Sequence, residues 1–163
     1  MSKSWYVVYT APKAEKKIAK TVSDLGIESY LPLYTSIRKW SDRKKKVELP
    51  LFPNYVFVKT ENKNRFELFN VHGILKFVSV QRNPVVVREN VIEMIRKAMD
   101  HEFEVLQEDY FQTGTEVLVK EGQLSGLTGV VLKQNGSSRV MLRIEKLQKA
   151  FSINIPTQYL EQI

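Results

Sequence analysis

The chain has 163 residues, of which 43% are hydrophobic and 26% are charged, a composition typical of one ordinary folded domain or two small ones. It contains no cysteine, which excludes disulfides, thiolate metal sites and cysteine nucleophiles. No apolar run approaches the ~18 residues needed to cross a bilayer, and the first residues lack the apolar core of a signal peptide, so the sequence indicates a cytoplasmic protein.

The formal net charge of +7 is concentrated at the start of the chain. Residues 1–60 carry twelve Lys and Arg against five Asp and Glu, whereas residues 61–113 carry seven against nine. Residues 114–163 carry six against four. This asymmetry favours a polyanionic partner, although solubility alone also accounts for a net charge of this size.

The first predicted elements are a strand and a helix. Residues 4–10 are rich in aromatic and β-branched side chains and predict a strand, and residues 12–26 predict a helix that ends at Gly26. At 100° per residue, the helix has an apolar stripe and a lysine stripe on different sides. The apolar stripe comprises Ile18, Val22 and Leu25, and the lysine stripe comprises Lys13, Lys16, Lys17 and Lys20.

Two extended segments, 28–40 and 47–60, are predicted to form the arms of a hairpin around a charged tip at 41–46. In the second arm, Val56 and Val58 point to one face of the strand, and Tyr55 and Phe57 point to the other. Both faces are apolar and the second is aromatic. The aromatic face has two interpretations, a part of the protein's own core or a surface on which a partner docks.

The remaining elements of the first hundred residues complete a known pattern. Residues 62–70 predict a short helix, 73–80 a strand, 83–84 a turn and 88–99 a longer helix. The order strand, helix, strand, strand, helix, strand is the split βαββαβ pattern of a ferredoxin-like sandwich, so the fold class is α+β. Helices cover one face of such a sheet. We therefore expect Tyr55 and Phe57, together with Tyr9, to face outward.

The C-terminal part differs in composition. Residues 100–113 hold five acidic residues and no Lys or Arg, which predicts a linker over 101–113. Residues 114–163 contain five of the seven glycines and four short strand patterns, typical of a small β-barrel. Residues 139–151 also show helical periodicity, so strand–turn–strand and helix both remain open there, and the surrounding glycines and Pro156 favour the strands.

These segments together resemble the NusG family. The sequences WYVVYT (5–10), LFPNYVFV (51–58) and GILKFVSV (73–80) are similar to the NusG-type N-terminal domain, and residues 114–132 resemble a KOW motif that opens an SH3-like barrel. The resemblance implies an N-terminal domain at 1–100, a linker at 101–113 and a KOW domain at 114–163. It is closest to the specialised paralogues of the RfaH and UpxY kind, which are transcription antiterminators, often for surface polysaccharide operons.

The resemblance implies a docking surface for RNA polymerase. Members of the family bind the beta-prime clamp helices through a hydrophobic depression of the N-terminal domain, and aromatic side chains suit such a contact because they bury a large area at a low entropic cost. Some of these residues could instead belong to the core. The positions implied are Tyr9, Phe52, Pro53, Tyr55, Phe57 and Phe77.

The resemblance also implies contact with the non-template DNA strand in the transcription bubble. The lysine stripe suits phosphate groups, which gives salt-sensitive binding, and His72 lies where a basic contact residue is expected. Arg43 and Lys44 at the hairpin tip are further candidates for contact with nucleic acid. The alternative for all of these residues is a solvated surface with no partner.

For the KOW domain, the resemblance implies a second partner, either the termination factor Rho or the NusE-type small ribosomal subunit protein. Leu147 aligns with a hydrophobic contact position, and Phe151 and Ile153 lie near it in the sequence. In one branch of the family this domain can refold from a helical hairpin to a barrel. We expect a monomer without a cofactor.

Nothing in the sequence predicts catalysis. His72 and His101 are not at metal-ligand spacing, and the glycines at 122, 126 and 129 lack the Gly-Lys-Ser/Thr ending of a phosphate-binding loop. We therefore expect no enzyme. The competing interpretation is an RNA-binding or ribosome-associated module whose aromatic side chains stack on bases.

Overall fold

The computed structural model describes residues 2–39, 41–100, 105–110, 113–135 and 137–163. The chain divides into two compact units, described separately below: one comprises Met1–Pro32 with Phe52–Ile92, and the other Leu33–Leu51 with Glu93–Ile163. No helix within the described ranges is long and apolar enough to cross a membrane.

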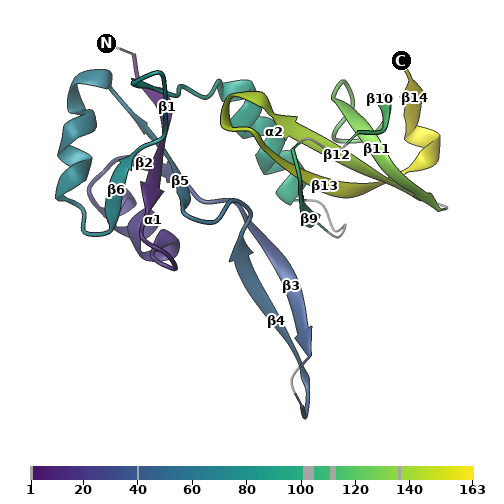
Figure 1. Cartoon of the computed structure of the whole chain (residues 1–163), viewed down its shortest axis with the longest axis horizontal. Coiled ribbons are helices and arrows are strands. Elements are labelled where there is room, and N and C mark those ends of the chain that lie inside the picture. The colour runs from purple at the N-terminus through teal and green to yellow at the C-terminus, as the bar shows by residue number, and fades with distance from the viewer. Residues whose placement is uncertain (1, 40, 101–104, 111–112, 136) are drawn as a thin grey trace. The chain divides into compact units, whose positions relative to one another are not determined.

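The first unit is built on a four-stranded antiparallel sheet, with β1 in the interior beside β5 (Figure 1). The strand order is β2 (Glu28–Tyr30), β5 (Tyr55–Thr60), β1 (Ser4–Thr10) and β6 (Ile74–Phe77). The predicted strand at 73–80 is interrupted after Phe77, because β7 (Ser79–Val80) pairs instead with β8 (Asn83–Pro84). The α+β arrangement expected from the sequence is confirmed.

Helices account for the other predicted segments of this part of the chain. The lysine-bearing helix is α1 (Glu15–Asp24), residues Asn62–Asn70 form the 3₁₀ helix η1, and Glu89–Met99 form α2. Ile18 and Val22 of α1 are buried against the sheet, but Leu25 is 62% exposed, which differs from the predicted apolar stripe. The reason is that α1 ends at Asp24 and Gly26 follows at φ 84°, so Leu25 leaves the helix.

Helices cover one face of the sheet, as the sequence predicts. The core on this side is formed by the alternate residues of β1 and β5, by the apolar face of α1 and by residues from η1 to β6. Its members are Tyr6, Val8, Ile18, Val22, Val56, Val58, Leu68, Val71, Ile74 and Phe77. Val56 and Val58 thus face α1, as the alternation in the sequence predicts.

The opposite face is not the open surface that the sequence suggested. Trp5, Val7 and Phe57, which lie on it, are at most 2% exposed. One cause is the segment before α2, which runs beside β1: Val87 donates its N–H to the Trp5 carbonyl, and the indole N–H of Trp5 donates to Glu89 Oε2 at 2.7 Å. This face is therefore mostly interior.

A tight turn introduces β5. The Tyr55 N–H donates to the Phe52 carbonyl at 3.1 Å, with Pro53 second and Asn54 third in the turn. Asn54 has φ 71°, and a turn with positive φ at this position is type II, which favours Pro at the second position and Gly or Asn at the third. The sequence Phe52-Pro53-Asn54-Tyr55 therefore fixes the direction in which β5 starts.

A buried carboxylate holds this turn against α1. Glu15 in the first helical turn is 6% exposed, and its Oε2 accepts the backbone N–H of Asn54 at 2.9 Å. The Asn54 side-chain amide donates to the Thr10 carbonyl at 3.0 Å, and the Thr10 N–H donates to the Asn54 carbonyl at 2.8 Å. We call these contacts the Glu15–Asn54 clasp. It joins the end of β1, the start of α1 and the start of β5.

The second unit contains the predicted hairpin, although its arms are shorter than the sequence suggested. β3 (Leu33–Lys39) and β4 (Lys44–Pro50) form a two-stranded antiparallel sheet of their own (Figure 1). The predicted arms at 28–40 and 47–60 each divide into two strands, because their central prolines end the pairing. β2 and β5 belong to the sheet of the first unit instead.

The rest of the second unit is a six-stranded antiparallel sheet of the β-rich, KOW-like kind. Its order is β14 (Leu160–Gln162), β10 (Thr115–Val119), β11 (Thr128–Asn135), β12 (Ser137–Ile144), β13 (Lys149–Pro156) and β9 (Val105–Glu108). The ambiguous segment at 139–151 is strand–turn–strand: the short 3₁₀ turn η2 (Glu145–Leu147) joins β12 to β13, with Gln148 at φ 51°.

The predicted linker contains a strand. β9 lies within 101–113 and pairs with β13, from Val105 opposite Ile153 to Glu108 opposite Ala150. The Ser152 hydroxyl also donates to Glu108 Oε1 at 2.6 Å. Residues 101–104 and 111–112 of the predicted linker lie outside the described residues. The acidic composition of this segment concealed its pairing, because only Val105 in β9 is buried.

The Glu15–Asn54 clasp predicts a specific loss of stability. Glu15→Ala removes the acceptor of the Asn54 N–H and should lower the free energy of unfolding by about 1–3 kcal/mol. Glu15→Gln keeps an oxygen acceptor and should cost less. The measurements are urea unfolding and amide hydrogen exchange at Asn54, which should accelerate in Glu15→Ala.

The matched control is Glu67→Ala, because Glu67 is an exposed glutamate of the same unit. It should change the free energy of unfolding by no more than about 0.5 kcal/mol. If Glu15→Ala and Glu67→Ala have equal effects on stability and on exchange at Asn54, the clasp does not hold the turn.

Candidate functional site

Two tyrosines form the partly exposed centre of the predicted aromatic surface. Tyr9 at the end of β1 is directly opposite Tyr55 at the start of β5, and both are half-buried. Their ring centroids are 6.0 Å apart at an interplanar angle of 72°, the edge-to-face geometry that aromatic pairs prefer. We call these residues the tyrosine pair. The Glu15–Asn54 clasp lies directly beside it in the chain and fixes both strand ends.

The Tyr55 hydroxyl of the tyrosine pair is uncharged at physiological pH. Partial burial raises the pKa of the Tyr55 hydroxyl above its usual value near 10, and the neighbouring Tyr9 raises this pKa further. A neutral phenol presents both an apolar ring and a hydrogen-bonding group. The surface can therefore accept an apolar partner without the cost of desolvating an anion.

The other predicted residues of β5 and its turn differ in their exposure. Pro53 is exposed, whereas Phe52 is 3% exposed and Phe57 is fully buried. The Phe57 ring packs edge-to-face on Phe52, with centroids 6.4 Å apart, and lies 6.2 Å from the Tyr30 ring. Phe57 shares the predicted face of β5, but the expectation that it faces solvent was wrong, because these neighbouring rings cover it.

Phe77 lies on the opposite face of the sheet. It pairs with Val8, packs edge-to-face on Tyr6 at a centroid distance of 6.0 Å, and belongs to the core under α1. The expectation that Phe77 joins the aromatic surface was therefore wrong. Its neighbour Lys76, which sequence reasoning missed, pairs with Tyr9 and places its Nζ 5.4 Å from the Tyr9 ring centroid.

Further exposed apolar side chains near this sheet were also missed. Leu75 is 57% exposed, where the pairing of β1 with β6 shifts register between Tyr9 and Thr10. Phe66 and Phe69 on η1 are 65% and 45% exposed, and the Arg65 guanidinium stacks 4.9 Å from the Phe66 ring centroid. No sequence pattern separates these residues from buried ones, because η1 lacks a regular apolar stripe.

All four lysines of the stripe are exposed, but only three of them lie on the helix. Lys16, Lys17 and Lys20 are exposed on α1, whereas Lys13 precedes the helix, in a turn where its φ is 62°. Lys20 Nζ lies 3.2 Å from Asp24 Oδ2, and both side chains are more than 60% exposed. An ion pair this exposed contributes little to stability, so it leaves Lys20 available to an anion.

The structure brings the loop of His72 beside the start of α1. Ala11 donates its N–H to the Gly73 carbonyl at 2.8 Å, and Gly73 packs against Ala14 and Ile18. His72 itself is exposed. Gly73 has φ 101° and leaves little room for a side chain, which explains why a glycine follows His72.

Arg43 and Lys44 lie at the far end of the hairpin and are exposed, as predicted. Lys44 begins β4 and is directly opposite Lys39 of β3. Both residues belong to the second unit, whereas the lysine stripe and His72 belong to the first.

The three residues predicted to bind a partner of the barrel lie in its interior. Leu147 is 5% exposed, and Phe151 and Ile153 are fully buried. Phe151 is paired with Leu142 and Ile153 with Val140 across β12 and β13, and all four side chains are buried. The expectation of a contact surface at these residues was wrong, because the alternation that makes them prominent in the sequence points them into the core.

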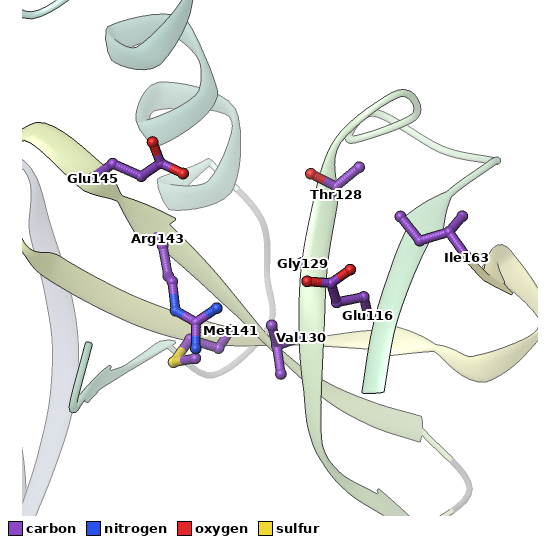
Figure 2. A pocket seen from close by; sticks show the side chains of 8 residues that line it. All are labelled: Glu116, Thr128, Gly129, Val130, Met141, Arg143, Glu145 and Ile163. Carbon is purple, nitrogen blue, oxygen red and sulfur yellow. The ribbon is translucent and has the colours of Figure 1, made fainter. Parts of the chain in front are cut away.

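The barrel instead carries a polar notch, which the sequence did not suggest (Figure 2). Arg143 is held there through its Nε–H, which donates to the Tyr110 carbonyl at 2.9 Å, and its guanidinium lies 5.7 Å from the Tyr110 ring. The lining residues are Glu116, Thr128, Gly129, Val130, Met141, Arg143, Glu145 and Ile163.

Metal ligands are not grouped in the described ranges: no three His, Asp or Glu side chains there are placed to hold an ion. His101, the second histidine considered in the sequence, lies outside those ranges.

Comparison with known proteins identifies relatives of the chain. Residues 3–96, more than half of the sequence, match a family model described as "NusG: Transcription termination factor nusG". The "Transcription termination/antitermination protein NusG" of Rickettsia bellii is 26% identical over 141 residues, which cover 80% of this chain and 74% of the relative. The protein of the same description from Rickettsia felis is also 26% identical over 141 residues, with coverages of 79% and 73%.

Comparison with solved structures supports the same fold. A structure described as "Domain interaction in Thermotoga maritima NusG" is similar to the chain with a TM-score of 0.61 and 23% sequence identity, covering 99% of this chain and 97% of that one. At this identity the likeness concerns the fold, and the family match over residues 3–96 carries the assignment. The chain belongs to the NusG family of transcription termination and antitermination factors.

Proposed function

We propose that this protein is a transcription elongation and antitermination factor that binds RNA polymerase through the tyrosine pair. It docks on the beta-prime clamp helices and suppresses pausing and termination on specific operons, as a specialised member of the family of the RfaH and UpxY kind. Surface polysaccharide operons are the first candidates. The observation that carries the proposal is a pair of half-buried aromatic side chains, fixed at two strand ends, within the family-matched segment.

The burial pattern divides the docking residues by role. Tyr9, Pro53 and Tyr55 are accessible to a partner, whereas Phe52 and Phe57 are buried and pack on each other. Phe77 is excluded from the surface because its ring lies in the core under α1. A small number of well-supported aromatic anchors is typical of interfaces in which a few residues dominate the binding energy.

The lysine stripe and His72 supply the proposed contact with the non-template DNA strand. Lys16 and Lys17 are exposed on one side of α1, and the loop of His72 lies beside the start of this helix. Lysine attracts phosphate as a point charge without reading bases, so the contact is sequence-independent and sensitive to salt. Arg43 and Lys44 are proposed to contact nucleic acid from the hairpin.

The barrel is proposed to recruit a second protein, either a NusE-type small ribosomal subunit protein or Rho. Leu147, Phe151 and Ile153 do not serve as contacts in the barrel form, because they are buried. The polar notch lined by Arg143 is an accessible alternative on this unit, because its charged lining residues suit a polar side chain. The protein is proposed to act in the cytoplasm as a monomer, without catalysis or a cofactor.

The tyrosine pair is tested by binding to purified RNA polymerase. Tyr55→Ala and Tyr9→Ala should each weaken binding by tenfold or more, because aromatic anchors at interface centres contribute about 2 kcal/mol or more. The measurement is fluorescence anisotropy of the labelled protein with core polymerase. The control is Tyr159→Ala, because Tyr159 is a half-buried tyrosine of the barrel.

The same variants are then used to capture partners from nuclease-treated lysate, after thermal melting has shown that each is folded. The proposal fails if Tyr55→Ala keeps the affinity of the unaltered protein for polymerase. It also fails if ribosomal subunits or RNA are captured and polymerase is not. That result favours the RNA-binding or ribosome-associated alternative.

The lysine stripe is tested with a single-stranded DNA of 20 nucleotides. Lys16→Gln with Lys17→Gln should lower the slope of log affinity against log salt by about 0.7 for each phosphate that the protein no longer neutralises. The control variant, Lys97→Gln with Lys120→Gln, has the same net charge and removes two exposed lysines outside the stripe. Equal slopes in the two variants would assign the binding to overall charge rather than to α1.

A further inference from the structure

The hairpin formed by β3 and β4 has a base without Lys or Arg and a cationic far end. Seven register pairs run from Leu33 opposite Pro50 to Lys39 opposite Lys44. At ~3.4 Å per residue, this ribbon is about 20 Å long. Residues 38–46 contain six Lys and Arg against the single acid Asp42, whereas the base is made of apolar, hydroxyl and one glutamate residue.

The cross-strand register of the far end places like charges opposite each other. Lys39 is directly opposite Lys44. Like charges in directly opposed positions destabilise an antiparallel pair. A tip that served solubility alone could alternate its charges across the strands at no cost. A polyanion bound at the far end would relieve the repulsion between these two lysines.

The cations lie on both faces of the ribbon. Lys44 and Lys46 share one face because side chains alternate along a strand, and Lys45 lies on the other. All three are exposed. An element that lies flat on a charged surface needs cations on one face only. An element that enters a groove between two rows of phosphates is served by cations on both.

We propose that the far end of this hairpin binds duplex DNA by entering the major groove. The major groove of B-form DNA is about 12 Å wide and admits a two-stranded ribbon, whereas the major groove of A-form RNA is too deep and narrow. Ile37, which is 63% exposed opposite Lys46, can contact a thymine methyl group there. The inference deepens the proposed function and rests on it, because an elongating polymerase always carries duplex DNA.

The test uses three labelled probes of one sequence: a 20-bp DNA duplex, the single strand and a 20-bp RNA duplex. The hairpin variant is Lys44→Gln, Lys45→Gln and Lys46→Gln. The control variant, Lys3→Gln, Lys97→Gln and Lys120→Gln, has the same net charge and removes exposed lysines elsewhere. Anisotropy is measured between 50 and 200 mM salt, and thermal melting establishes that both variants are folded.

The hairpin variant should bind the DNA duplex at least tenfold more weakly, and its slope of log affinity against log salt should fall by about 2.7, or ~0.9 for each phosphate that the protein no longer neutralises. The control variant and the single-stranded probe should change far less. Replacing the three lysines by arginine should restore binding. Methyl green, a major-groove ligand, should compete with the protein, and netropsin, a minor-groove ligand, should not.

The inference is overturned if the hairpin and control variants lose equal affinity, or if the RNA duplex or the single strand binds as tightly as the DNA duplex through the same lysines. Competition by netropsin alone would also overturn the proposed groove. Polymerase binding by the hairpin variant is measured separately. Retained polymerase binding with unaltered duplex binding refutes only the hairpin proposal, whereas failure of the tyrosine variants to affect polymerase refutes only the proposed docking.

Discussion

The candidate site of the first unit depends on one hydrogen bond to a buried carboxylate. Glu15 accepts the backbone N–H of Asn54, whose positive φ creates the turn that starts β5. The carboxylate lies in the first turn of α1, where the helix dipole favours a negative charge. The same contact therefore positions the lysine-bearing helix and Tyr55. The proposed docking surface and the proposed nucleic-acid surface thus share one structural contact.

The second face of the sheet is covered, and this limits the area that a partner can contact. A ferredoxin-like sheet with an open aromatic face would offer a broad, flat contact area, but Trp5, Val7 and Phe57 are buried. What remains accessible at the ends of β1 and β5 is the half-buried tyrosine pair, in which each ring packs edge-to-face on the other. Such preorganisation lowers the entropic cost of binding, which compensates for the modest area.

Elements that depend on local periodicity could be predicted from the sequence. The burial of side chains that depends on strands far along the chain could not. The alternation from Asn54 to Val58 and the position of α1 follow from neighbouring residues alone. Phe77 looks like a surface aromatic only until the strand register is known, because it points into a core completed by the distant strand β1. Lys76 was missed for the same reason, since its contact with Tyr9 follows from the pairing of β1 with β6.

The basic charge of the first 60 residues is divided between two elements with different geometry. On α1 the exposed lysines follow one side of a helix whose other side is buried, so they can meet a phosphate row from one direction only. On the hairpin, neighbouring lysines of β4 point to opposite faces and no core limits them. A one-sided stripe matches a single flexible strand, and a two-sided ribbon matches a groove. Under the two proposals, the arrangement of the lysines and not the net charge distinguishes forms of nucleic acid that carry the same phosphates.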